Sequence, residues 1–172
     1  HCHRVHRRTA PIGGNCRANR QASGRAVAAC SNNTQRYGKG AAMIGLVLVT
    51  HADLAAALLR SAEMIVGKQE CCEYVEVAPD EQADHIMNRV VEAVERVSTD
   101  GAIIMTDLFG GTPSNMAMSF LKDGKVEVLT GVNLPMLIDF FSKRSRLGVS
   151  DLATDLLRSG REGIISAGEF LK

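Results

Sequence analysis

The chain has 172 residues, 45% of them hydrophobic, and a formal net charge of +1, so it is long enough to bury one full core. The small net charge is the sum of two segments of opposite charge. Residues 1–42 contain eight Arg or Lys and no acid, whereas residues 43–172 contain twelve basic and nineteen acidic residues, a net charge of −7. No apolar run approaches the length of a helical membrane span, and we expect a single soluble domain.

Residues 1–42 show neither helical nor strand periodicity and are rich in Arg, Gly, Asn and Ser, which predicts a disordered basic leader. Met43 opens the first apolar run, so we interpret the leader as upstream sequence joined by a mis-set start. A nucleic-acid arm is disfavoured because aromatic residues are nearly absent, and a transit peptide because no amphipathic helix is evident. The leader's Cys and His residues match no paired-ligand template, so we expect no bound metal: Cys2, His3, His6, Cys16 and Cys30.

From Met43 onward, apolar runs typical of strands alternate with segments of helical spacing. Strands are expected at 44–49, 72–77, 102–106 and 125–129. Helices are expected from Asp53 to Gly67, from Asp80 through Val97, from Thr112 onward, at 136–142 and at 150–159, with Asp53 and Asp80 as N-caps. This order predicts an α/β fold, a doubly wound three-layer sandwich with a mainly parallel sheet of about four strands.

Two of the predicted strands end in residues that can carry chemistry. His51 ends the first apolar run, and Asp107 follows the third. Open α/β sheets bind ligands at the carboxyl ends of their strands, so we expect these two side chains to meet in one crevice. A carboxylate that accepts a hydrogen bond from Nδ1–H would leave Nε2 of the imidazole as the reactive atom.

The segment after Asp107 has the composition of an anion-binding loop. Gly110 and Gly111 allow backbone amides to turn toward a phosphoryl group, while Thr112 and Ser114 add hydroxyl donors. Phosphoryl transfer is mostly positioning and charge stabilisation, so such a loop facing a histidine can act without a metal or cofactor. Taken singly, each feature has an ordinary structural explanation, such as a turn or a cap. Their placement at two strand ends favours a site.

Three segments resemble one known family over the chain from Met43 almost to its end: Val49 to His51, Thr106 to Asn115, and Thr130 to Met136. They are similar to the enzyme IIA domain of the mannose family in the bacterial phosphoenolpyruvate-dependent sugar phosphotransferase system. The resemblance implies that residues 43–172 form a IIA phosphocarrier domain. Where the family commonly has Gly after the histidine, this chain has Ala52.

The resemblance also implies roles and partners. His51 would take a phosphoryl group on Nε2 from the histidine-containing phosphocarrier protein and pass it to a IIB component for sugar uptake, with Asp107 as its hydrogen-bonding partner. Gly110, Gly111, Thr112 and Ser114 would line the phosphate site. The protein would be a cytoplasmic homodimer that meets the membrane only through a permease complex, and it would need no cofactor or nucleic acid.

Other functions stay open on the residues alone. A stand-alone regulatory IIA protein, whose phosphorylation state is sensed by partners, and the phosphocarrier subunit of dihydroxyacetone kinase would use similar residues. A hydrolase is disfavoured because no Gly-x-Ser-x-Gly occurs, and a nucleotide or flavin binder because no glycine-rich loop follows the first strand. His85, in the second predicted helix, is interpreted as a surface residue.

Overall fold

The structure is a computed structural model and describes residues 43–171. Its central element is a four-stranded parallel sheet in the order β2-β1-β3-β4. The strands are β1 (Gly45–His51), β2 (Cys72–Val77), β3 (Ala102–Thr106) and β4 (Val126–Thr130). The helices are α2 (Leu54–Val66), α3 (Ala83–Val97), α4 (Thr112–Met118), α5 (Leu134–Lys143), α6 (Val149–Glu162) and α7 (Ala167–Phe170).

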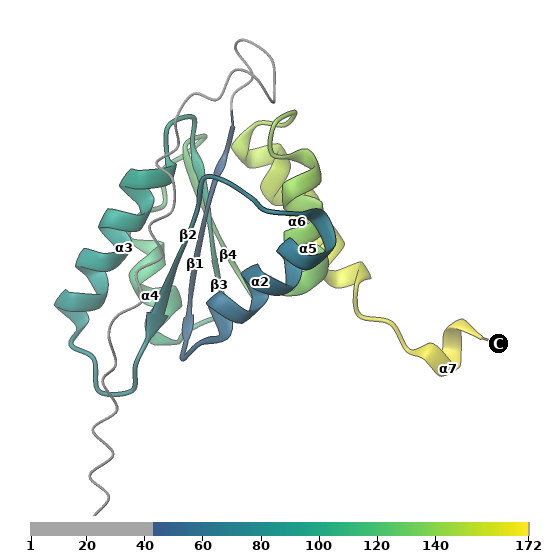
Figure 1. Cartoon of the computed structure of the whole chain (residues 1–172), viewed down its shortest axis with the longest axis horizontal. Helices are drawn as coiled ribbons and strands as arrows, with labels where there is room; N and C mark the ends of the chain where they lie inside the picture. The colour runs from purple at the N-terminus through teal and green to yellow at the C-terminus, as the bar shows by residue number, and fades with distance from the viewer. Residues whose placement is uncertain (1–42, 172) are drawn as a thin grey trace, which may run out of the picture.

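Helices cover both faces of the sheet, so the predicted doubly wound three-layer sandwich is confirmed (Figure 1). Helices α3 and α4 pack on one face, and α2, α5 and α6 on the other. Side chains alternate along β1 between these two cores, with Leu46 and Leu48 on the α2 side and Val47 and Val49 on the α3 side. All four are buried, which explains why the strand is an unbroken apolar run.

The strand order places the site. The chain leaves β1 in one direction to form β2 and then crosses to β3 on the other side of β1, so the winding reverses between these two inner strands. Strand β1 ends at His51, which has Val77 of β2 as its register partner, and β3 ends one residue before Asp107. A crevice at the carboxyl ends of β1 and β3 is where this class of fold binds its ligands.

Of the two predicted N-caps, one was confirmed and one was wrong. Asp53 is the N-cap of α2, as predicted, although its side chain makes no capping bond; the Oγ1 of Thr50 accepts from the Ala55 amide at 2.8 Å. The N-cap of α3 is Gln82 and not Asp80, because a turn closes residues 78–81 through Glu81 N–H to the Ala78 carbonyl.

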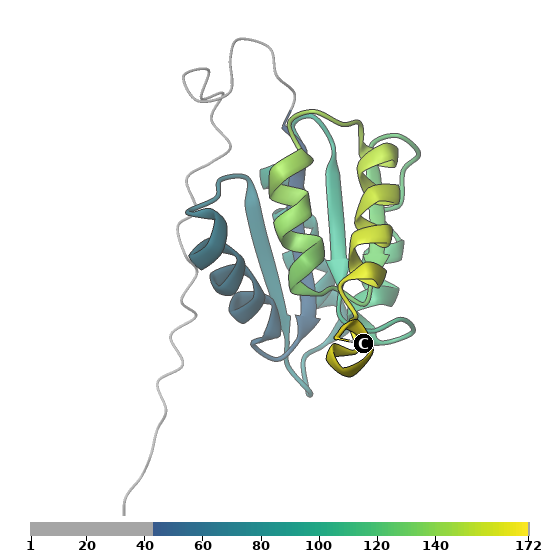
Figure 2. The ribbon, with the colours of Figure 1, turned by 90° about the vertical axis from the view of Figure 1, so that its right-hand side faces the viewer.

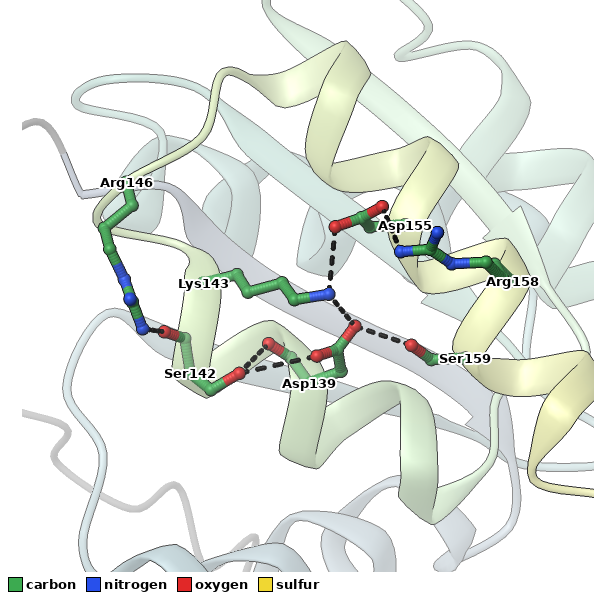
Figure 3. Close-up of polar contacts among 7 residues, drawn as sticks. All are labelled: Asp139, Ser142, Lys143, Arg146, Asp155, Arg158 and Ser159. Carbon is green, nitrogen blue, oxygen red and sulfur yellow. Dashed lines mark hydrogen bonds and ion pairs between the residues drawn. The ribbon is translucent and has the colours of Figure 1, made fainter.

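Helices α5 and α6 run antiparallel and are joined by a chain of polar contacts (Figure 3). Lys143 Nζ lies 2.9 Å from Oδ2 of Asp139 and 2.9 Å from Oδ2 of Asp155, so it bridges the two helices. Ser159 Oγ donates to the same Asp139 oxygen at 2.6 Å. The two helices also pack closely where α6 ends, since an added Cβ at Gly163 would lie 2.5 Å from Cγ of Pro135 in the first turn of α5.

Beyond Gly163 the chain extends away from the sandwich and ends in the short helix α7 (Figures 1 and 2). Ile164 and Ile165 in this segment are 81% and 65% exposed. Among residues 43–171, no helix has both the length and the apolar character that a membrane span requires.

Candidate functional site

The backbone and the ring of His51 both contact one carboxylate oxygen of Asp107. Oδ2 of Asp107 accepts from the backbone N–H of His51 at 2.9 Å and lies 2.9 Å from His51 Nδ1. Oδ1 of the same side chain accepts from the Leu108 amide at 2.9 Å. The end of β1 and the loop after β3 are thus joined through a single residue, and both the position and the ring orientation of His51 depend on it.

Hydrogen bonds keep the carboxyl group of Asp107 ionised. Its partial burial alone would raise the pKa, but the bonds from the His51 backbone and ring and from Leu108 outweigh it, so the pKa of Asp107 lies below its usual value. An ionised carboxylate only accepts hydrogen bonds, so Nδ1 of His51 carries the proton in this pair. Nε2 is then the nitrogen with a free lone pair, on a side chain that is 49% exposed.

Gly111 lies directly against the imidazole. A Cβ at this position would be 3.0 Å from Cε1 and 3.5 Å from Nε2 of His51, so the loop and the ring can meet this closely only when the residue has no side chain. The preceding residue, Gly110, has a φ of +82°, which L side chains rarely adopt. Gly110 is therefore needed for its backbone conformation, and Gly111 for its close contact with the imidazole.

The loop presents unused donors beside the ring. The amides of Gly110, Gly111 and Thr112 have no hydrogen-bond partner among residues 43–171. Thr112 is exposed at the start of α4, whereas Ser114 is buried and its Oγ donates to the Gly111 carbonyl at 3.0 Å. Ser114 thus holds the loop in the structure shown, and the amides and the Thr112 hydroxyl are the groups left to bind an anion.

The loop after β4 lies beside the end of β3 and depends on Asn133, which the sequence motifs did not single out. Asn133 accepts from the Met136 amide at 3.1 Å, which caps α5, and its Nδ2 donates to the Gly160 carbonyl of α6 at 2.9 Å. The amide of Val132 donates to the carbonyl of Thr106, the residue before Asp107. An Asn two residues before a Pro is a recognisable cap signal, but its bond to α6 could not be read from the sequence.

Other residues lie outside this constellation. His85 is exposed as predicted, with Nδ1 2.7 Å from Oε1 of Glu81. The Oγ1 of Thr106 is buried and has no hydrogen-bond partner among the described residues. No group of three or more His, Cys, Asp or Glu side chains within residues 43–171 could hold a metal ion. The Cys and His residues of the leader lie outside the described range.

The fold and this constellation define a class: an open parallel α/β domain with a carboxylate-oriented histidine facing a glycine loop at the switch point of its sheet. A family model described as "PTS system fructose IIA component" matches residues 45–157. The chain belongs to this family, the mannose-type IIA components of the phosphotransferase system, as its sequence motifs predicted.

Individual relatives agree with this assignment. The sorbose-specific EIIA component of Lacticaseibacillus casei is 32% identical over 125 residues, which cover 72% of this chain and 91% of the relative. The mannose-specific EIIAB component of Escherichia coli strain K12 is also 32% identical, over 70% of this chain, which spans only 38% of that protein. A crystal structure of an EIIA component from Streptococcus agalactiae has a TM-score of 0.68 at 28% identity, covering 74% of this chain and 99% of the other.

Proposed function

We propose that this chain takes a phosphoryl group on Nε2 of His51 from the histidine-containing phosphocarrier protein and passes it to a IIB component. The observation that carries the proposal is the pairing of His51 Nδ1 with Oδ2 of Asp107 at 2.9 Å, because in the neutral ring it places the proton on Nδ1 and leaves Nε2 as the nucleophilic nitrogen. The relatives named for mannose, sorbose and fructose support a IIA role in sugar uptake without fixing one sugar.

The transfer is an in-line displacement between two histidines. Nε2 of His51 attacks phosphorus, the N–P bond to the donor histidine breaks, and that histidine keeps the electron pair. The His51 ring becomes a cation that retains its proton on Nδ1, and the Asp107 carboxylate stabilises it. One N–P bond replaces another, so the step is close to thermoneutral and reversible.

The loop after Asp107 would hold the transferring group. The partner-free amides of Gly110, Gly111 and Thr112 and the Thr112 hydroxyl can donate to its oxygens. Ser114 contributes to the same phosphate site through the Gly111 peptide that its hydroxyl orients. We further propose that residues 43–172 are the phosphocarrier domain and that the chain acts in the cytoplasm, reaching the membrane only through a permease complex.

A homodimer is part of the proposal. Among the described residues, β2 and β4 each have a neighbouring strand on one side only, so both edges of the sheet can pair further. The segment after Gly163 extends from the body with two exposed isoleucines, Ile164 and Ile165. An exposed apolar segment that extends from the body, together with open sheet edges, supports association of two copies.

Phosphoryl transfer to the purified chain tests the assignment. Phosphoenolpyruvate, enzyme I and the phosphocarrier protein should give an acid-labile label on the wild type and none on His51→Ala, with both proteins showing the same circular dichroism. Asp107→Asn should take label more slowly, because an amide holds the tautomer less firmly and carries no charge to stabilise the ring cation. Label on His51→Ala, or none on the folded wild type, would overturn the proposal.

A further inference from the structure

The peptide unit between Val77 and Ala78 is hydrogen-bonded on both sides. Its carbonyl oxygen accepts from the Ala52 amide at 3.0 Å, and its N–H donates to Oε2 of Glu81 at 3.2 Å. Hydrogen bonds in a chain polarise one another, so a carboxylate on the N–H side makes the carbonyl a stronger acceptor. Glu81 is therefore connected, through one peptide unit, to the residue that follows His51.

The backbone of Ala52 depends on that bond. Its φ of +50° is a conformation that a residue with a side chain keeps only where neighbouring groups hold it. The carbonyl of the peptide between His51 and Ala52 has a longer contact, 3.4 Å from Oγ1 of Thr50. The bond from the Ala52 amide to Val77 is the shorter of the two, so it fixes the direction in which the chain leaves His51.

The Glu81 side chain is itself held in place by α3. Only 10% of it is exposed, and its Oε1 lies 2.8 Å from Nη1 of Arg89 and 2.7 Å from Nδ1 of His85. The same Arg89 nitrogen donates to the Glu76 carbonyl at 2.9 Å, so it joins the carboxylate to the end of β2. Burial alone would raise the pKa of Glu81, but these bonds and the one from the Ala78 amide outweigh it and place the pKa below its usual value. The group is therefore an ionised, fixed acceptor.

We propose that Glu81 is a positioning residue for phosphoryl transfer at His51. Asp107 holds the backbone N–H of His51 directly, at 2.9 Å, and Glu81 holds the following peptide through the unit between Val77 and Ala78. This inference rests on the proposed phosphocarrier function and adds a second carboxylate to it. Glu81 acts through backbone groups and takes no part in donor binding, so its loss slows transfer by misplacing the ring.

The chain offers a matched control. Glu73, near the start of β2, is 14% exposed and lies 3.8 Å from Arg96 of α3. Glu73 and Glu81 thus each join the β2 region to α3 through an arginine, but only Glu81 contacts the peptide that reaches Ala52. A carboxylate that served stability alone would give the same result at both positions.

Glu81→Gln and Glu73→Gln are compared by labelling with the phosphocarrier protein over a range of donor concentrations. A neutral amide of the same size loses the charge-assisted bonds. We expect Glu81→Gln to lower the rate at saturating donor about three- to tenfold with an unchanged KM. Glu73→Gln should label at the wild-type rate.

The Ala52 amide gives a readout that does not depend on labelling. In Glu81→Gln its proton resonance should shift upfield and its exchange with deuterium should become faster, because its acceptor is weakened. In Glu73→Gln both should match wild type.

Ala78→Pro tests the route from the carboxylate to the backbone, because it removes the N–H that donates to Glu81. Val77 is a strand residue, and an extended residue accepts a following proline. This variant should slow labelling by a similar factor, and the double variant Ala78→Pro with Glu81→Gln should be no slower than either single one. It also keeps the test decisive if Glu81→Gln does not fold.

Each outcome decides the inference. Equal labelling rates for Glu81→Gln, Glu73→Gln and wild type overturn it while the phosphocarrier function stands. Equal slowing of both Gln variants, or additive slowing in the double variant, also overturns it, because Glu81 then acts through overall stability or another contact. A raised KM with an unchanged saturating rate places Glu81 in donor binding instead. A folded wild type that takes no label removes the proposed function, and the inference with it.

Discussion

Gly111 is the position at which the site has least space for a side chain. In Gly111→Ala the new Cβ would lie 3.0 Å from Cε1 of His51, so the ring or the loop must move by a few tenths of an ångström. The ring is held by Asp107, and small misplacements of reacting groups are costly, so we expect phosphoryl transfer to slow by about tenfold or more. Labelling rates measure the effect. Gly148→Ala, where a Cβ would meet nothing within 4 Å, should transfer at the wild-type rate, and equal rates for the two variants would contradict the prediction.

Ala52 has a φ of +50°, in the left-handed region that favours glycine. Ala52→Gly relieves the backbone strain of the folded state but also raises the conformational entropy of the unfolded chain. We expect the first contribution to be larger, so the free energy of unfolding should rise by about 0.5–1 kcal/mol. Urea denaturation measures it. Ala57→Gly, in the interior of α2, should instead lose about 1 kcal/mol. A loss at both positions would show that Ala52 is unstrained.

The sequence predicted some residues of the site and missed others, for a physical reason. His51 and Asp107 follow apolar runs, and strand ends in a parallel sheet share one edge, so their proximity followed from the pattern. Thr50 and Asn133 act through backbone groups that only the folded chain brings within reach. The close contact of Gly111 with the imidazole is likewise a property of the packed structure and not of sequence spacing.

At the scale of elements, the polar contacts between α5 and α6 (Figure 3) support the loop after β4, which contacts the end of β3. Ser159 and Lys143 meet on Asp139, and one turn further on Gly160 and Gly163 let α6 approach Met136 and Pro135 closely. The loop held in this way is the one whose Val132 amide donates to Thr106. The two helices therefore support the site from a distance.

Asp139→Asn tests this support through pH. Burial alone would raise the pKa of Asp139, but hydrogen bonds from Ser159 and Lys143 outweigh it and place the pKa below its usual value. A lowered pKa gives stability that is complete above about pH 4 and is lost as pH falls through the folded-state value. We expect Asp139→Asn to be about 1 kcal/mol less stable at pH 7.

The same variant should lose less stability than wild type on acidification below about pH 4, because the titrating group is gone. Thermal unfolding at a series of pH values measures both effects. Asp123→Asn, which removes an exposed carboxylate without hydrogen bonds or ion pairs among the described residues, should follow the wild-type curve. If the stability of Asp139→Asn changes with pH in the same way as that of wild type, the hydrogen bonds of Asp139 contribute nothing to the pH dependence of stability.

Element types were easier to predict than element ends. The four strands and the order of helices followed from the change between apolar runs and helical spacing. The N-cap of α3 was wrong by two residues, because the Ala78 to Glu81 turn competes with the helix for the same backbone groups. The helix α7 was not predicted, since its four residues are too few to show a period.

At the scale of the whole molecule, the exposed segment after Gly163 predicts how copies associate. The double variant Ile164→Asp with Ile165→Asp should shift the protein from dimer to monomer without changing its circular dichroism, because it removes apolar surface outside the core. Light scattering after gel filtration measures the mass. Met64→Asp, at an exposed position on α2, should remain dimeric. A wild type that is monomeric at tens of micromolar would contradict the proposed homodimer.

Alternation of strands and helices predicted the parallel sheet, whereas the order β2-β1-β3-β4 could not be read from it, because apolar runs do not show which strand lies inside. That order has a consequence for the phosphoryl relay. Strands β1 and β3 have neighbours on both sides and helices on both faces, so their amides should be among the last in the protein to exchange with deuterium. In the proposed relay, the phosphoryl group would be gained and lost at His51, at the end of the backbone that is expected to open least often. If the proposed relay operates, repeated cycles of phosphorylation should proceed without local unfolding of these strands.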